Sequence, residues 1–152
     1  MLRRIADLIK NGRRFLITSH VRLDGDALGS ELALYHILIA MGKDVKIYNE
    51  DETPDRYRFL PGSDVIVHAW PNVSDIDTAF ILDCSNLERM GRESSKLAAM
   101  KNIVNIDHHI ENGAFSDLNL RDKDASSTGE MLYRLFLHMG VPLSKDAATS
   151  LY

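Results

Sequence analysis

Short apolar runs rich in β-branched residues alternate along this chain with stretches of helical spacing. Strands of a parallel sheet are buried on both faces and therefore carry continuous apolar runs, and helices usually connect them. The runs at 15–19, 45–48, 65–67, 79–83 and 103–107 are the expected strands. We therefore predict an α/β fold, in which a parallel β-sheet of about five strands is flanked by helices on both faces.

Start and stop signals mark the expected helices. An apolar stripe that includes Ile5 marks the first helix, and a second helix over 27–41 is expected to stop at Gly42. The stretch 127–130, Ser-Thr-Gly-Glu, is a capping box that opens a third helix. Ser144 is a candidate N-cap for a last helix, which reaches the end of the chain.

The composition limits the possible partners. The 152 residues suffice for one domain with a buried core, and the net charge of −4 argues against binding of duplex DNA or of an anionic membrane. No apolar run approaches the length of a membrane span, and the amino-terminal residues lack the apolar core of a signal sequence. The single cysteine, Cys84, cannot form an internal disulfide, so we expect a cytoplasmic protein.

Acidic residues and histidines gather where the expected strands end. His20, Asp24 and Asp26 follow the first strand, Asp83 ends the fourth, and Asp-His-His at 107–109 ends the fifth. Ligands of open α/β sheets bind at the carboxyl ends of strands, so these residues are expected to form one site. Imidazole nitrogen combined with carboxylate oxygen suits Mn²⁺, with Mg²⁺, Co²⁺ or Fe²⁺ as alternatives. Two ions about 3.5–4 Å apart would serve hydrolysis of a phosphate ester.

Two further residues are candidates for contact with an anionic substrate. Ser30 follows Gly29 at the start of the second helix, where backbone amides favour anions. Arg89 lies shortly after the fourth strand, and a surface ion pair is an equally weighted alternative for it. Cys84 is expected to be a small buried residue, because a metal-activated nucleophile makes a covalent step unnecessary.

Three motifs, in this order, resemble those of the DHH phosphoesterase superfamily. They are SHVRLDGDALGS at 19–30, LDCSNLERMG at 82–91 and NIDHH at 105–109. The segments TPDRYRFLPG at 53–62 and ASSTGEML at 125–132 further resemble the nanoRNase/pAp phosphatase subgroup, of NrnA type. The resemblance covers essentially the whole chain, and it implies a Rossmann-like DHH domain.

The resemblance implies a role for each metal-binding candidate. His20, Asp24 and Asp83 would bind one Mn²⁺ ion. Asp26, Asp83 and His108 would bind a second ion, so that Asp83 bridges the two.

The third motif also implies the catalytic groups. His109 would face the scissile phosphate, and Asp107 would orient its neighbours as a supporting carboxylate. Leu23 stands where the family usually has proline, which affects the stiffness of the loop rather than metal binding.

The family pattern also implies more chain than these 152 residues. A fourth motif, with an aspartate that completes the second metal site, would follow Tyr152. The C-terminal DHH-associated domain that binds substrate would come after it. We therefore expect residues 1–152 to be the DHH phosphoesterase domain, truncated before the fourth motif and weak or inactive alone.

The activity that the resemblance implies is Mn²⁺-dependent hydrolysis of short oligoribonucleotides and of 3′-phosphoadenosine 5′-phosphate (pAp), by hydroxide activated between two metal ions. Other activities of the superfamily remain open: a cyclic dinucleotide phosphodiesterase, a RecJ-like single-strand exonuclease or a family II pyrophosphatase. A non-catalytic nucleotide-binding regulatory module is the alternative from a different class. The expected partners are a short oligonucleotide or nucleotide phosphate and, in a homodimer, a second copy of the chain.

Overall fold

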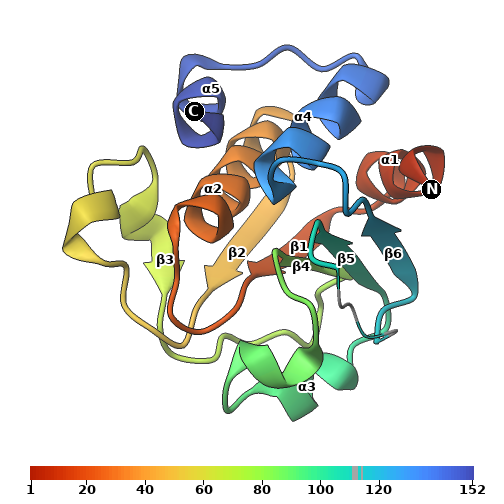
Figure 1. Cartoon of the computed structure of the whole chain (residues 1–152). Coiled ribbons are helices and arrows are strands. Elements are labelled where there is room, and N and C mark those ends of the chain that lie inside the picture. Colours follow the sequence, from red (N-terminus) through yellow and green to blue (C-terminus); the bar gives the residue numbers. More distant parts are fainter. Residues whose placement is uncertain (111–112, 114) are drawn as a thin grey trace.

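Six parallel strands form one sheet in the computed structural model of the chain, which describes residues 1–110, 113 and 115–152 (Figure 1). The strands are β1 (Arg14–Thr18), β2 (Asp44–Tyr48), β3 (Ile66–Val67), β4 (Thr78–Leu82), β5 (Ile103–Asp107) and β6 (Leu118–Arg121). Their order across the sheet is β3-β2-β1-β4-β5-β6, and every neighbouring pair is parallel. The chain progresses outward in both directions from β1 and β4, so the order reverses between these two strands. In such sheets this switch point leaves a crevice at the carboxyl ends of the strands.

The five expected strands are confirmed, and β6 is an additional sixth strand at the edge of the sheet. Its four residues, LNLR, include only one that is buried, Leu118. Because an edge strand needs an apolar surface on one side only, this short segment lacks the continuous apolar run that marks the central strands.

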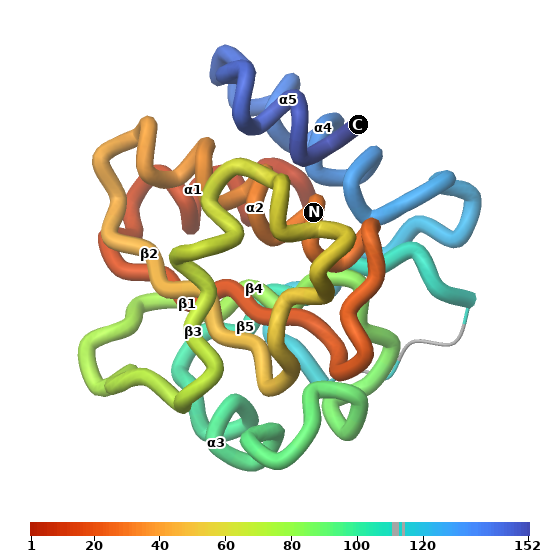
Figure 2. The backbone as a smooth tube through the Cα atoms, turned by 90° about the vertical axis from the view of Figure 1, so that its left-hand side faces the viewer, coloured from red at the N-terminus to blue at the C-terminus, as the bar shows by residue number. Residues whose placement is uncertain are grey.

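Helices cover both faces of the sheet, as predicted, but very unequally (Figures 1 and 2). One face carries α1 (Leu2–Asn11), α2 (Gly25–Ala40) and α4 (Thr128–Met139), and α5 (Lys145–Leu151) packs on the outside of α2. The opposite face carries α3 (Ser94–Ala98) and the 3-10 turn η3 (Leu87–Met90). Two further 3-10 turns, η1 (Asp55–Tyr57) and η2 (Ser63–Val65), lie between β2 and β3.

Each face of the sheet has its own core. Side chains of α1, α2 and α4 pack with Phe15, Ile17 and Phe80 in the larger cluster. Leu16 and Ile81 point to the other face, where they pack in a smaller cluster with residues of η3 and α3. This alternation along β1 and β4 is the expected consequence of strand geometry, and it explains why the central strands are apolar throughout.

The helix ends follow the local signals in the sequence. Asp24 is the N-cap of α2, and its carboxylate accepts the amide of Ala27 at 3.0 Å. Ser127 and Ser144 are the N-caps of α4 and α5, as predicted. The capping box is only half formed, because the Glu130 carboxylate accepts the amide of Ser126 instead of that of Ser127.

Gly29 has a packing role that differs from the one expected. A Cβ atom at this position would collide with the carbonyl oxygen of Ser150 in α5. The absence of a side chain therefore lets α2 and α5 approach closely. Within the part of the chain that the structure describes, no helix combines the length and the apolar character needed to cross a lipid bilayer.

Candidate metal and active site

The three groups of predicted site residues meet at the carboxyl ends of β1, β4 and β5. His20 follows β1, Asp83 follows β4 directly, and Asp107 is the last residue of β5. Asp83 has a φ of +55°, in the left-handed region that non-glycine residues seldom occupy. Its amide nonetheless donates to the carbonyl of Ile106 on β5 at 3.0 Å, so the turn is held by the neighbouring strand. Strained backbone of this kind is concentrated at functional sites.

His20 presents a free nitrogen to Asp83. The ring is buried, with 4% exposure, and its Nδ1 lies 2.8 Å from the carbonyl oxygen of Val21. A carbonyl can only accept, so Nδ1 carries the proton and Nε2 keeps a lone pair in the neutral ring. Nε2 has no hydrogen-bond partner among the described residues and lies 3.4 Å from Asp83 Oδ2. The Asp83 carboxylate raises the pKa of His20, and burial of the ring opposes this shift.

Asp83 stands at the centre of two groups of potential metal ligands. One group is His20, Asp24 and Asp83, and the other is Asp83, His108 and His109; within each, the ligand atoms lie within 4.8 Å of one another. Asp83 is 2% exposed and contributes Oδ2 toward His20 and Oδ1 toward His108. The first group is the predicted set for the first ion. A carboxylate with one oxygen toward each group has the arrangement expected of a bridging ligand.

Asp26 lies beside the second group, with its carboxylate held by the start of α4. Its Oδ2 is 3.5 Å from His108 Nε2 and accepts the amide of Thr128 at 2.8 Å, whereas Oδ1 accepts the amide of Gly129 at 3.0 Å. Burial raises the pKa of Asp26, and the two amide hydrogen bonds oppose that shift. Each carboxylate oxygen has two lone pairs, so these bonds leave capacity for a metal ion.

Thr128 is a site residue that the sequence analysis assigned only to a helix start. Its side chain is fully buried, and its hydroxyl donates to Asp83 Oδ1 at 3.1 Å. One residue therefore contacts Asp83 through its side chain and Asp26 through its backbone. The signal in the sequence was the Ser-Thr-Gly-Glu stretch, but nothing local indicated that the partner carboxylates come from about 100 and 45 residues away.

Both histidines of the Asp-His-His triplet lie 3.6 Å from Asp83 Oδ1, but their other contacts differ. His108 Nδ1 faces the carbonyl of Ala125 at 3.3 Å, which directs Nε2 toward Asp26 and Asp83. His109 Nδ1 lies 2.6 Å from Asp107 Oδ1, and the side chain of His109 is 38% exposed. Asp107 itself is fully buried, so it can orient His109 but cannot meet a substrate directly.

The residues fit a divalent cation of borderline softness. The site offers imidazole nitrogens with fixed tautomers, carboxylate oxygens and one buried nitrogen, His20 Nε2, that lacks a hydrogen-bond partner among the described residues. Thiolate takes no part, because burial raises the pKa of Cys84 to about 12 and the thiol is held at the carbonyl of Asn86. Such a donor set matches Mn²⁺ and its neighbours among the divalent metals.

The two predicted substrate-binding residues occupy different positions. Arg89 lines a cavity together with His20 and Asp24, and its guanidinium is 3.5 Å from the hydroxyl of Ser85. Ser30 is 1% exposed, and its hydroxyl lies 3.4 Å from Asp26 Oδ1. The contact of either residue with substrate stays a prediction.

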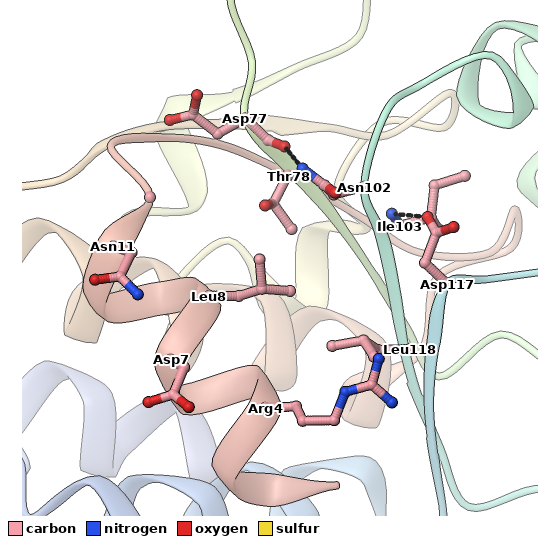
Figure 3. A pocket seen from close by; sticks show the side chains of 11 residues that line it. Arg4, Asp7, Leu8, Asn11, Asp77, Thr78, Asn102, Ile103, Asp117 and Leu118 are labelled. Atoms are coloured by element: carbon pink, nitrogen blue, oxygen red, sulfur yellow. Dashed lines mark hydrogen bonds between the residues drawn. The ribbon is translucent and has the colours of Figure 1, made fainter.

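A second polar cavity, of about 570 Å³, lies at the other edge of the sheet, near the amino ends of β4 and β5 (Figure 3). Two of the acidic residues that line it, Asp77 and Asp117, are engaged in structural hydrogen bonds. Asp77 accepts the amides of Arg13 and Arg14 at 2.7 and 2.8 Å, and Asp117 accepts the amide of Ile103 at 2.8 Å. Figure 3 shows the hydrogen bond from Ile103 to the Asp117 carboxylate, and that from the Asn102 side chain to the backbone carbonyl of Asp77. These carboxylates secure strand starts instead of forming a metal site.

Comparison with known proteins agrees with this geometry. Residues 14–152 match the DHH family, N-terminal domain. The chain belongs to the DHH family. Among relatives of this DHH chain is the bifunctional oligoribonuclease and PAP phosphatase NrnA of Thermus thermophilus, which is 31% identical over 150 residues, or 97% of the chain and 44% of that protein.

Two solved structures extend the comparison of this DHH domain. An exopolyphosphatase-related protein from Bacteroides fragilis superposes with a TM-score of 0.94 at 30% identity, over 99% of the chain and 47% of that protein. The exonuclease RecJ bound to manganese superposes with a TM-score of 0.58 at 17% identity, over 99% of the chain and 41% of RecJ, which shows a shared fold. The chain spans less than half of the length of each of these proteins.

Proposed function

We propose that this DHH domain is the metal-binding part of a Mn²⁺-dependent phosphoesterase that hydrolyses short oligoribonucleotides and the 3′-phosphate of pAp. The observation that carries the proposal is the position of Asp83. It is buried between His20 and His108, with one oxygen directed toward each. The substrates follow from the oligoribonuclease and PAP phosphatase named among the relatives. Manganese is supported by the donor set and by its presence in the RecJ structure of the same fold.

Two overlapping sets of residues would bind the two metal ions. His20, Asp24 and Asp83 would hold one ion, and Asp26, Asp83 and His108 would hold the other. Bound ions would supply a nucleophile at neutral pH and charge stabilisation at the phosphate. The carbonyls of Val21 and Ala125 keep the protons of His20 and His108 on Nδ1, so both rings turn Nε2 toward Asp83, where they could bind metal.

His109 is the residue of the triplet that can meet the substrate. Its side chain is more than one third exposed, and Asp107 holds its Nδ1 at 2.6 Å. The ring orientation is thus fixed before substrate binds. In the imidazolium form both ring nitrogens are donors, so Nε2 can then donate to a phosphate oxygen. A donor placed there stabilises charge that develops on the phosphate in the transition state.

Phosphate release from pAp and shortening of a five-nucleotide RNA, both measured with the full-length protein that contains this domain, test the proposal. Both are expected with Mn²⁺, to be lost with EDTA and to return when Mn²⁺ is restored. Cyclic dinucleotides, single-stranded DNA and pyrophosphate serve as comparison substrates. A higher kcat/KM for one of these would assign the protein to that activity, and no hydrolysis of any of them with bound Mn²⁺ would indicate a non-catalytic module.

A further inference from the structure

A cavity of about 510 Å³ lies directly beside the first group of metal ligands. Its walls come from the loop after β1 and the loop after β4, the two strands that flank the switch point. His20 and Asp24 line the end next to the metal-binding residues, and Arg22 and Arg89 line the rest together with Asn86 and Glu88. This volume is in the range of cavities that hold small ligands.

The two arginines are available to a ligand. In the described part of the chain, neither guanidinium lies within 4.0 Å of a carboxylate, whereas Arg14, Arg58, Arg92 and Arg134 all form ion pairs. Arg89 has one neutral contact, with the hydroxyl of Ser85 at 3.5 Å. The cavity lining also holds the carboxylates of Asp24 and Glu88, but among the described residues neither forms an ion pair with Arg22 or Arg89.

The backbone fixes the two arginine-bearing loops to one another. The amide of Val21 donates to the carbonyl of Arg89 at 2.8 Å. Arg22 has a φ of +61°, and its amide donates to the Asp51 carboxylate at 2.5 Å. A left-handed conformation costs a non-glycine residue roughly 1–3 kcal/mol and persists only where the surroundings impose it. Arg22 is therefore held in its position by Asp51 and by the loop that carries Arg89.

We propose that this cavity binds a second, non-scissile phosphate group of the substrate through Arg22 and Arg89. The inference rests on the proposed function, because it places the scissile phosphate at the Asp83 centre. In pAp the second group is the 5′-phosphate, and in an oligoribonucleotide it is a neighbouring backbone phosphate. Guanidinium groups bind phosphate through paired, charge-assisted hydrogen bonds, which makes them selective for it over neutral groups.

A pair of substrates that differ only in the second phosphate isolates this subsite. Both pAp and 3′-AMP carry the scissile 3′-phosphate, but only pAp carries the 5′-phosphate. Arg22→Ala and Arg89→Ala are expected to lower kcat/KM for pAp by about 10- to 100-fold, the loss typical of one charge-assisted contact, and to change kcat/KM for 3′-AMP by less than about 3-fold. Equal losses on both substrates would overturn the proposal.

Three further variants separate the effect of the guanidinium group from the effects of loop conformation and of charge elsewhere. Arg22→Gly removes the side chain but keeps a residue that tolerates positive φ, so it should match Arg22→Ala if the loop stays in place. Arg3→Ala removes an equal charge from an exposed position of α1, and should leave kcat/KM for both substrates within about 2-fold. Glu88→Gln removes a negative charge from the same cavity, and should raise kcat/KM for pAp; a decrease would contradict a phosphate subsite.

Binding of AMP and adenosine, measured by calorimetry with Mn²⁺ present, does not depend on turnover. AMP is expected to bind at least about 10-fold more tightly than adenosine, and Arg22→Ala and Arg89→Ala should abolish the difference. If pAp is not hydrolysed but this difference is found, the proposed function fails and the subsite stands. If pAp is hydrolysed but AMP and adenosine bind equally, the subsite fails and the proposed function stands.

Discussion

Both edges of the sheet carry carboxylates, but Asp77 and Asp117 at the amino edge are exposed, whereas Asp83 at the carboxyl edge is buried and belongs to a candidate site. At the amino edge, Asp77 and Asp117 accept backbone amides at the starts of strands. At the carboxyl edge, Asp83 has a left-handed backbone and faces His20, whose Nε2 has no hydrogen-bond partner among the described residues. A functional cluster is distinguished by binding capacity that the fold leaves unused, and not by the number of acidic residues.

The direction of the strands explains this difference. The first residues of parallel strands present free amide groups, which a nearby carboxylate satisfies, as Asp77 does for Arg13 and Arg14. At the carboxyl ends the loops diverge on either side of the switch point and leave a crevice. Asp83 and Asp26 there are held by α4 at the crevice, where they can still meet a ligand.

The largest effect is expected at the centre of the carboxyl edge. Asp83→Asn keeps the size of the side chain but removes the charge between His20 and His108. We expect activity on pAp to fall on the order of 10³-fold, because the shared ligand of both ions is lost. Initial rates and Mn²⁺ binding by calorimetry measure this. Asp77→Asn at the amino edge is the matched control, and an equal loss in that variant would remove the distinction between the edges.

Glu31 on α2 should make the stability depend on pH. It is completely buried, its Oε2 accepts the Asn49 amide at 2.8 Å, and burial raises its pKa to about 8. Between about pH 4.5 and 8 the folded protein keeps this proton and the unfolded chain loses it, so stability falls as pH rises, by about 1.4 kcal/mol per pH unit. Urea unfolding at pH 5.5, 6.5 and 7.5 measures this slope.

Glu31→Gln provides the comparison for that measurement. The amide is neutral at every pH, so the part of the slope that comes from position 31 should disappear. The free energy of unfolding of the variant should therefore increase relative to that of the natural protein as pH rises. Identical slopes for the two proteins would show that Glu31 is ionised in the folded state.

Thr128 should act on the metal site without contacting substrate. Thr128→Val keeps the shape and removes the hydroxyl that donates to Asp83, so we expect Mn²⁺ affinity to fall by about 10- to 100-fold, as for other residues that orient metal ligands. Thr128→Ser restores the donor and should recover most of the affinity. Ser127→Ala removes the N-cap of α4 but not the Asp83 contact, and so controls for helix stability. A loss in Thr128→Ser equal to that in Thr128→Val would refute the role of the hydroxyl.

The smallest effect is expected at the amino edge. Asp77→Ala removes the acceptor for two exposed backbone amides, which water can partly replace, and should lower the free energy of unfolding by about 0.5–1 kcal/mol, with no change in Mn²⁺ affinity. These hydrogen bonds lower the pKa of Asp77, so its contribution is present above about pH 4 and disappears as the pH falls through the lowered value. Unfolding curves at pH 7 and pH 3 test this, since the cost of the substitution should shrink at the lower pH.

The sequence was most informative where the signal is local. The five apolar runs became strands, and Ser127 and Ser144 became N-caps, because burial on both faces and capping chemistry leave direct marks in the sequence. It was least informative where the residue type permits several uses. The sequence placed Gly29 at an anion-binding helix start, whereas the structure shows that Gly29 permits the close approach of α5. Strand β6 was too short and too polar to be recognised.

The sequence by itself indicated the parallel α/β fold and the residues at its carboxyl edge, since parallel strands all end at the same edge; that β1, β4 and β5 are neighbours came from the structure. Only the tertiary structure decided how these residues divide their contacts. Thr128 at the start of α4 donates hydrogen bonds to Asp26 and Asp83, which lie 102 and 45 residues away in the chain. The hydrogen bond from Val21 to Arg89 connects the loops that carry Arg22 and Arg89. Such contacts depend on packing between distant segments, and neither periodicity nor capping signals contain that information.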